Sequence, residues 1–393
     1  MGSSFRDIWL LNLSTLFFFL GISLVNPIIS PFAITLGAGP FLVGLIAGAA
    51  SVVSLFSKPI GGLMGDRGYR IQAMILGNVL GILAGALYVA SAFLGNLPLF
   101  GFGRVIHGFS MGVFFPSSLA TAVDLAPEGR VGETLGWRGM MFSLGNIIGP
   151  ALGGYLSDVL GFTGTFSFTI LFSLAGGLLI LPVWMEFKNA GRKETHMGTE
   201  RDYSGLLRVT FVAASLSLFF FSFSYAGVVT YLPALYKVLG MPQRVFGFYM
   251  MVVGAASFVM RLFGGRGADR MGPIPVIRIG MLLVIAGYVS LLFEELPPYS
   301  YLSAALVGAG FGLAVPAMQL MALGNLPARV RTMGSSVYTM FFDLGMLGGQ
   351  ISLGYVADLR GYSGVFPLLP FIAIVSLIII HAPLAIGGRE DEG

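Results

Sequence analysis

The sequence predicts an all-α integral membrane protein with twelve transmembrane helices in two pseudo-symmetric six-helix bundles. Composition is the first observation behind this prediction: of the 393 residues, 56% are hydrophobic and only 10% are charged. A soluble domain has about 25% charged residues, so lipid rather than water must cover much of this chain, in agreement with the mean hydropathy of +0.87. The other two observations are apolar runs of spanning length and an internal repeat.

The apolar runs recur along the whole chain, and each contains roughly the 20 residues that a helix needs to cross a bilayer. Because lipid cannot hydrogen-bond a backbone, each spanning segment must be a helix. The first run resembles a signal sequence, but it is too long and lacks a small-residue cleavage site, so we interpret it as a retained span. The predicted helices are 8–32, 41–63, 71–94, 98–124, 134–158, 163–186, 207–236, 245–264, 274–293, 300–324, 334–357 and 364–386.

The second half of the chain repeats the first. The stretch FSLGNIIGPALGGYLSDVLGFTGTF from Phe142 matches FFDLGMLGGQISLGYVADLRGYSGVF from Phe341. Chance similarity between glycine-rich segments is the alternative, but the register holds over four pairs of helices. A duplicated six-helix unit is typical of transporters, whose substrate site lies between the halves. The residues Gly108, Gly112, Gly145, Gly149, Gly154, Tyr155, Asp158 and Gly161 recur 200 positions later.

One long polar segment, Lys188 to Gly205, divides the predicted helices six and six. Most lysines and arginines fall in this segment and in the loops on the same side, so the positive-inside rule places that side in the cytoplasm. We therefore expect a multi-pass protein of the plasma (inner) membrane with both termini cytoplasmic. The predicted domains are an N-terminal bundle, a cytoplasmic linker and a C-terminal bundle, at 1–187, 188–206 and 207–393.

The composition also argues against several classes of function. The chain has no cysteine and only three scattered histidines, so we expect no disulfide and no metal site. We find no Ser/His/Asp set and no phosphate-binding loop of the Walker type. An enzyme is therefore disfavoured, and a receptor would more often carry a sizeable soluble domain.

The loop after the second predicted helix reads GGLMGDRGYR from Gly61, and its repeat reads GGRGADRMGP from Gly264. An aspartate here can accept hydrogen bonds from a helix N-terminus. Both loops resemble the signature G-x-L-A-D-R-x-G-R of the major facilitator superfamily, with departures at Tyr69 and Pro273, and the resemblance covers essentially the whole chain. It implies a cytoplasmic gate that stabilises the outward-open state; plain turn chemistry is the alternative. The implied gate residues are Gly62, Asp66, Arg67, Arg70, Asp269 and Arg270.

The fourth predicted helix carries RVIHGFSMG from Arg104 and resembles the family pattern R-x-x-Q-G, with His107 in place of glutamine. Ionisable residues in spans are costly and face the protein interior or a wet cavity. Residues three apart share a helix face. The resemblance implies that Arg104 serves proton coupling or substrate polarity, with His107 beside it; the alternative is an arginine that snorkels to the outer interface.

The fifth predicted helix contains GNIIGPALGGYL and resembles the family pattern G-x-x-x-G-P-x-x-G-G, which is associated with exporters that exchange substrate for protons. Small residues allow close helix packing and proline bends a helix. The resemblance implies that the bend holds one access state against leakage, and a generic packing surface is the alternative. The second half has Gln350 at the position of the proline. The motif residues are Gly145, Gly149, Pro150, Gly153 and Gly154.

Asp343 lies near the middle of the eleventh predicted span and is our first choice for the proton-coupling carboxylate, with Arg104 and His107. Its repeat partner is Ser143, and a structural aspartate paired with Arg138 is the alternative. Many proton-driven exporters of the superfamily carry an acid in the first helix, where this chain has an asparagine. A cavity with more cations than acids would suit neutral or anionic substrates. The predicted cavity residues are Asn26, Arg138, Tyr225, Tyr231, Gln319, Tyr338 and Gln350.

These patterns together predict a secondary active transporter that exports small organic molecules in exchange for protons by alternating access. An organic-anion importer or exchanger that clamps its substrate with Arg104 and Arg138 is the alternative. We expect no cofactor, because an ion gradient, here of protons, supplies the energy. The expected partners are a small-molecule substrate and the lipid bilayer, with no nucleic acid, and family resemblance predicts a monomer.

Overall fold

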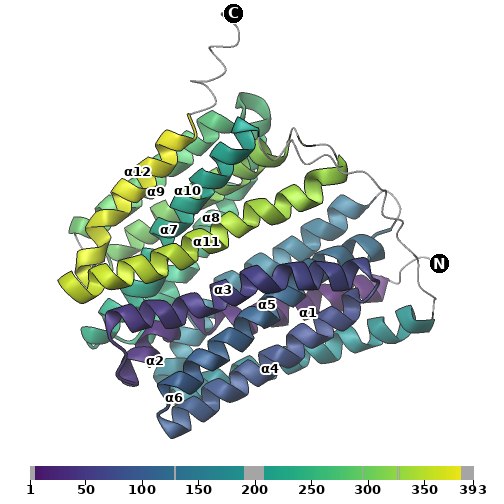
Figure 1. Cartoon of the computed structure of the whole chain (residues 1–393), viewed down its shortest axis with the longest axis horizontal. Helices are drawn as coiled ribbons and strands as arrows, with labels where there is room; N and C mark the ends of the chain where they lie inside the picture. Colours follow the sequence, from purple (N-terminus) through teal and green to yellow (C-terminus); the bar gives the residue numbers. More distant parts are fainter. Residues whose placement is uncertain are drawn as a thin grey trace, which may run out of the picture. The chain divides into compact units, whose positions relative to one another are not determined.

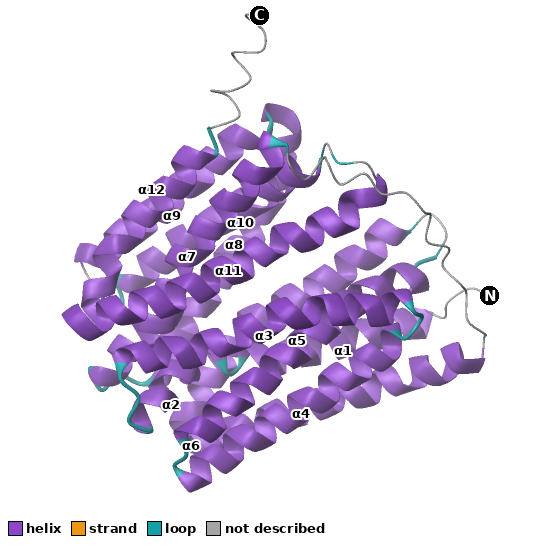
Figure 2. Ribbon diagram, in the orientation of Figure 1, coloured by secondary structure: helices purple, strands orange, loops and turns teal. Residues whose placement is uncertain are grey.

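A computed structural model describes residues 5–127, 130–189, 208–293, 295–324, 326 and 328–381. Every regular element among these residues is a helix, as Figure 2 shows, which confirms the all-α prediction. The chain divides into two compact units. The predicted linker 188–206 lies almost entirely outside the described residues. The first unit contains Met1–His196 and Tyr236–Met251, and the second contains Met197–Leu235 and Val252–Gly393.

The first predicted span is broken near its end. The helix α1 stops at Ser23, because Pro27 has no N–H to donate and its ring would clash with the carbonyl four residues earlier. A short 3-10 turn follows and the chain then resumes as α2. The helices of this span are α1 (Phe5–Ser23), η1 (Asn26–Ile28) and α2 (Ile29–Thr35).

The other helices of the first unit follow the predicted spans closely. The last of them, α6, contains both 134–158 and 163–186, with a sharp bend at Gly161 (φ 70°, ψ −179°). A residue with a side chain would be strained at this positive φ. In this unit α1 packs against α6, while α3 and α4 both pack against α5 (Figure 1). These helices are α3 (Pro40–Asp66), α4 (Arg70–Leu94), α5 (Leu97–Leu125) and α6 (Val131–Asn189).

The second half supplies the remaining helices. Among them α9 packs against α10 and α12 (Figure 1). The end of α7 and the start of α8 belong to the first unit, and the rest of both helices belongs to the second. The elements are α7 (Val209–Val238), α8 (Gln243–Met271), α9 (Pro273–Phe293), α10 (Ser300–Leu323), α11 (Ala328–Arg360), η3 (Tyr362–Leu368) and α12 (Leu369–Ile379).

Ten helical stretches of the described residues are long and apolar enough to cross a membrane. One of them, Glu133–Met185, covers both predicted spans of the bent α6 except for the last residue of the second. The 33-residue helix α11 is not among the ten but is also long enough to cross. The arrangement is therefore consistent with twelve membrane-crossing segments.

Candidate functional site

A buried polar cluster lies inside the first unit, between α3, α4 and α5. His107 is 1% exposed, and its Nδ1 lies 2.8 Å from the hydroxyl of Tyr88. Arg104 precedes it by one turn on α5, is 8% exposed, and donates from Nη2 to the carbonyl of Ala47 at 3.1 Å. The Nε of Arg104 and the Nε2 of His107 are buried and make no hydrogen bond to any described residue. The cluster therefore has unused hydrogen-bonding groups inside the bundle.

Glycines bring the three helices of this cluster close together. A Cβ atom on Gly108 would lie 2.3 Å from the backbone oxygen of Ala50, so α5 is in direct backbone contact with α3. A Cβ atom on Gly103 would lie 2.8 Å from the ring of Tyr88 on α4. Small residues permit this close approach of helices in membranes. Because the two helices are this close, the side chain of Arg104 on α5 reaches a carbonyl of α3 inside the bundle.

A second buried guanidinium lies on α6 and packs against the last turns of α5. Arg138 is 4% exposed, and its Nε and Nη2 donate to the Ser118 hydroxyl at 3.1 and 2.7 Å. Its Nη2 also donates to the Phe115 carbonyl at 3.2 Å, and its guanidinium lies 4.9 Å from the centre of that ring. These partners are neutral, so the charge is solvated by dipoles and by an aromatic face. Pairing with Asp343 stays a prediction, since that residue belongs to the other unit.

Three of the glycines predicted on the fifth span, Gly145, Gly149 and Gly153, lie on the face of α6 that contacts α1 and the residue after it, whereas Gly154 faces α8. Cβ atoms on Gly145 and Gly149 would lie 2.7 Å from side-chain atoms of α1, and one on Gly153 would lie 1.9 Å from the carbonyl oxygen of Leu24. The hydroxyl of Ser23 donates to Asn146 Oδ1 at 2.7 Å in the same contact. This face is a close-packing surface, as the glycine spacing predicts.

The first predicted gate loop joins α3 to α4. Arg70 donates from Nε to the carbonyl of Gly65 at 3.1 Å and forms an ion pair with Asp124 at the end of α5. Arg67 and its counterpart Arg270 are exposed. The aspartates are the central residues of the predicted gate, and their side chains lie outside the described residues. They are Asp66 and Asp269.

The predicted cavity residues of the second unit differ in their contacts and in their burial. The hydroxyl of Tyr231 donates to the main-chain carbonyl of Gln350, whose side-chain Oε1 is buried without a hydrogen bond from the described part of the chain. Tyr338 donates to the carbonyl of Val315 at 3.5 Å. The ring of Tyr225 stacks on that of Phe221 with 6.1 Å between centres. Asp343 in this unit and Asn26 in the first unit are half-buried, and Gln319 is exposed.

Sequence reasoning missed the partners that complete these groups. The aromatic hydroxyl beside His107 belongs to Tyr88, whose recurrence as Tyr288 in the repeat is a usable signal. The partners of Arg138 and Arg70 are Ser118 and Asp124, which no motif marks. Among the described residues, no group of three or more His, Cys, Asp or Glu side chains is placed to hold a metal ion.

Comparison with known sequences gives a family for this architecture. The model of the family described as Major Facilitator Superfamily matches residues 11–350. An uncharacterised transporter of that type from Methanocaldococcus jannaschii is 24% identical over 391 residues, which cover 96% of this chain and 97% of the relative. The multi-drug resistance efflux pump PmrA of Streptococcus pneumoniae is 26% identical over 355 residues, or 88% of each chain.

Solved structures agree on the fold. A transporter of the POT family, solved in complex with 5-aminolevulinic acid, superposes with a TM-score of 0.77. The alignment covers 96% of each chain at 16% identity. At this identity the similarity supports the shared fold and carries no statement about the substrate.

Proposed function

The chain belongs to the Major Facilitator Superfamily of membrane transporters, and from that premise we propose that it exports small organic molecules in exchange for protons. The observation that carries the proposal is the glycine face of α6, where Gly145 and Gly149 pack closely against α1 and Gly153 meets the backbone of Leu24 just after it. These glycines belong to the pattern that resembles proton-exchanging exporters of the superfamily. The relative PmrA, named a multi-drug resistance efflux pump, supports the same direction of transport.

The proposed cycle assigns distinct tasks to the two units. Substrate enters from the cytoplasm and binds between the halves, which then rock so that the site opens on the other side. A proton from outside binds at Asp343, with His107 as a relay, and resets the carrier. The buried pair of Arg104 and His107 supports this assignment, because its unused nitrogen atoms can exchange partners during the cycle. We place the protein in the plasma membrane as a monomer, with both termini cytoplasmic.

A second function is favoured by the buried cations of the first unit. Arg104 and Arg138 are 8% and 4% exposed, and the partners described for both are neutral. Guanidinium groups in this state can bind a carboxylate or phosphate through two hydrogen bonds. The alternative proposal is therefore an importer or exchanger of organic anions. In that case replacement of either arginine by lysine abolishes transport, while changes at Asp343 have little effect.

The deciding experiment measures pH inside proteoliposomes that contain a pH-sensitive dye. Cationic, neutral and anionic compounds are added in turn to the parent protein and to Asp343→Asn. Proton antiport predicts a substrate-triggered proton flux that the variant reduces at least about tenfold, equivalent to roughly 1.4 kcal/mol in barrier height. Glu295→Gln is the matched control, since that carboxylate lies between α9 and α10, outside the predicted spans, and accepts a hydrogen bond from Ser363.

Each result has a definite consequence for the two proposals. A flux that Asp343→Asn loses and Glu295→Gln keeps supports antiport and also identifies the charge class of the substrate. If anionic compounds cross without a proton flux, and Asp343→Asn behaves like the parent protein, antiport is wrong and the arginine-based anion carrier takes its place.

A further inference from the structure

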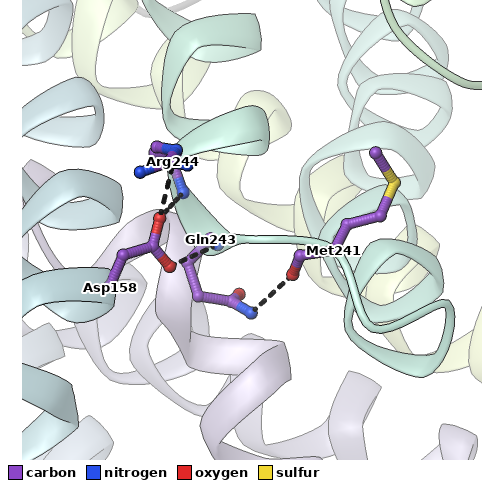
Figure 3. Close-up of polar contacts among 4 residues, drawn as sticks. All are labelled: Asp158, Met241, Gln243 and Arg244. Carbon is purple, nitrogen blue, oxygen red and sulfur yellow. Dashed lines mark hydrogen bonds and ion pairs between the residues drawn. The ribbon is translucent and has the colours of Figure 1, made fainter.

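The first turn of α8 is capped by a carboxylate from a distant helix (Figure 3). Asp158 on α6 accepts hydrogen bonds at Oδ1 from the backbone N–H of Gln243 at 2.8 Å and at Oδ2 from that of Arg244 at 3.0 Å. The next N–H, of Val245, donates to the carbonyl of Pro242 at 3.1 Å. The first N–H groups of a helix have no partner within it. Since Pro242 has no polar side chain to act as a cap, Asp158 satisfies them instead.

The backbones of α6 and α8 are in direct contact beside this cap, along the turns of α6 that precede Asp158. A Cβ atom on Gly154 would lie 2.7 Å from the backbone oxygen of Gln243. A Cβ atom on Gly247 would lie 2.6 Å from the backbone oxygen of Pro150. The glycines therefore set the distance at which the aspartate can reach two N–H groups at once.

The capped turn is the place where α8 enters the first unit. Residues Tyr236–Met251 belong to that unit, and α8 continues from Val252 in the second. All the contacts of the cap lie within the first unit. Asp158 therefore fastens the beginning of a helix from the second half of the chain onto α6 of the first half.

We propose that Asp158 is an outer latch, which favours the inward-facing state by holding the start of α8 on α6. The inference rests on the proposed function, because rocking of the two halves requires this contact to separate whenever the outer end opens. Opening would leave two N–H groups and one carboxylate without their partners. For the cytoplasmic gate at the other end, the sequence motif predicts the same chemistry of a carboxylate at a helix N-terminus.

The cap, rather than the nearby side-chain ion pair, supplies the latch. The Nε of Arg244 lies 3.9 Å from Asp158 Oδ2, and half of the arginine side chain is exposed. An exposed ion pair at that distance contributes little. The two backbone hydrogen bonds also align the carboxylate with the positive end of the helix dipole. Removal of the arginine side chain should therefore matter much less than removal of the carboxylate charge.

The test measures the populations of the two access states. The chain has no cysteine, so spin labels attach only at the introduced sites. We would introduce cysteines at Val159 and Leu239, which are exposed by 58% and 53%, and record distances by double electron–electron resonance in lipid nanodiscs. We expect Asp158→Asn to raise the ratio of outward-open to inward-facing molecules about fivefold, because asparagine keeps one acceptor oxygen but loses the charge at the helix N-terminus. Arg244→Ala should change that ratio by less than about twofold.

A second pair of variants tests the backbone N–H that donates to Asp158. Gln243→Pro removes the N–H that donates to Asp158 Oδ1, at a helix position where proline is tolerated. Gln243→Ala removes the same side chain and keeps the N–H. We expect a shift toward the outward-open state in the proline variant alone. This comparison also decides the question if Asp158→Asn fails to fold.

Two results would overturn the latch. One is a distance distribution in Asp158→Asn that equals that of the parent protein; the other is an equal distribution in Gln243→Pro and Gln243→Ala. The readout needs neither substrate nor protons, so it is independent of the flux assay. If the variants shift the populations but the flux assay detects no proton movement, antiport is contradicted and the latch is still supported.

Discussion

Tyr88 and Tyr288 occupy equivalent positions in the two halves of the chain, 200 residues apart, and both are completely buried. Their hydroxyl groups meet different partners. The hydroxyl of Tyr88 lies 2.8 Å from Nδ1 of His107, whereas the hydroxyl of Tyr288 accepts a hydrogen bond from Ser224 at 3.3 Å. The same ring position thus supports an ionisable partner in the first half and a neutral one in the second.

The neighbouring positions show a larger difference. Arg104 and His107 have Ala304 and Val307 as their counterparts, and both of these are completely buried. The second half therefore folds around an apolar interior where the first half has a guanidinium and an imidazole. Since the second half packs without such groups, we expect the polar groups of the first half to serve a function rather than packing.

A close backbone contact beside these positions is the same in the two halves. A Cβ atom on Gly108 would lie 2.3 Å from the backbone oxygen of Ala50, and one on Gly308 would lie 2.3 Å from that of Val253. Two duplicated bundles have kept this backbone contact, while the side chains inside them have diverged. The comparison separates residues that build the fold from residues that are free to carry function.

The largest expected effect comes from breaking the shared scaffold. Gly108→Ala and Gly308→Ala each place a methyl group against a backbone atom that cannot move aside as a side chain can. We expect each variant to lower the free energy of unfolding by about 3 kcal/mol, at the upper end for overpacked interiors. Thermal unfolding in detergent, followed by circular dichroism, measures both losses.

Gly101 on α5 provides the control for this prediction, because a Cβ atom there meets nothing within 4 Å. Gly101→Ala should raise the free energy of unfolding by up to about 1 kcal/mol through helix propensity. If Gly308→Ala proves harmless while Gly108→Ala does not, the two halves do not share a scaffold and the comparison fails.

The next effect tests whether the charges of the first half are dispensable for folding. The triple variant Arg104→Ala, His107→Val, Tyr88→Phe gives the first half the apolar residues of the second at two positions. The phenylalanine avoids a buried hydroxyl without a partner, which would cost about 1–3 kcal/mol. We expect the thermal unfolding midpoint to stay close to that of the parent protein. We expect transport to fall at least about tenfold, or roughly 1.4 kcal/mol in barrier height.

Tyr88→Phe alone is the control for that experiment and should retain most of the transport. Parent-level transport in the triple variant would show that the polar cluster takes no part in the cycle. Loss of the folded state would show that the first half needs its charges for packing, which the second half does not.

The fold could be predicted from sequence because lipid imposes strong local rules. Apolar runs and glycine spacing are local patterns, so they predicted the spans and the close-packed face at Gly145 and Gly149. Similarly, Arg104 and His107 are three residues apart on one helix, and the structure buries both. The resemblance to the superfamily, now shown by its family model, rests on equally short motifs.

The partners of these residues could not be predicted, because they come from distant parts of the chain. Asp158 caps a helix that begins 85 residues later, and the sequence around Pro242 indicates only that the helix has no cap of its own. Tyr88 meets His107 through the packing of α4 on α5, which depends on glycines of both helices. The break after Ser23 could have been predicted from Pro27, since proline disrupts the helix four residues before it.

The smallest expected effect concerns a serine hydrogen bond between helices that is present in both halves. In the second half, the serine of this bond has an additional hydroxyl partner. Ser14 donates to the carbonyl of Gly176 at 2.8 Å. In the second half, Ser217 contacts Ser376, which lies 200 positions after Gly176: its hydroxyl is 3.0 Å from the carbonyl and 2.8 Å from the hydroxyl of that residue. Hydrogen bonds between membrane helices contribute about 0.6 kcal/mol on average, so we expect Ser14→Ala to cost about that much and Ser217→Ala about twice as much.

Thermal unfolding of the two variants, compared with Ser290→Ala, measures the difference. Ser290 donates to the carbonyl of Gly287 in its own helix, so Ser290→Ala removes no hydrogen bond between helices and should lower the stability little. Equal costs for Ser14→Ala and Ser217→Ala would mean that the extra serine contact adds nothing to the stability of the second half. Apolar packing around residues such as Ala304 and Val307 would then account for the stability of that bundle. This outcome would strengthen the proposal that the charges of the first half serve transport rather than folding.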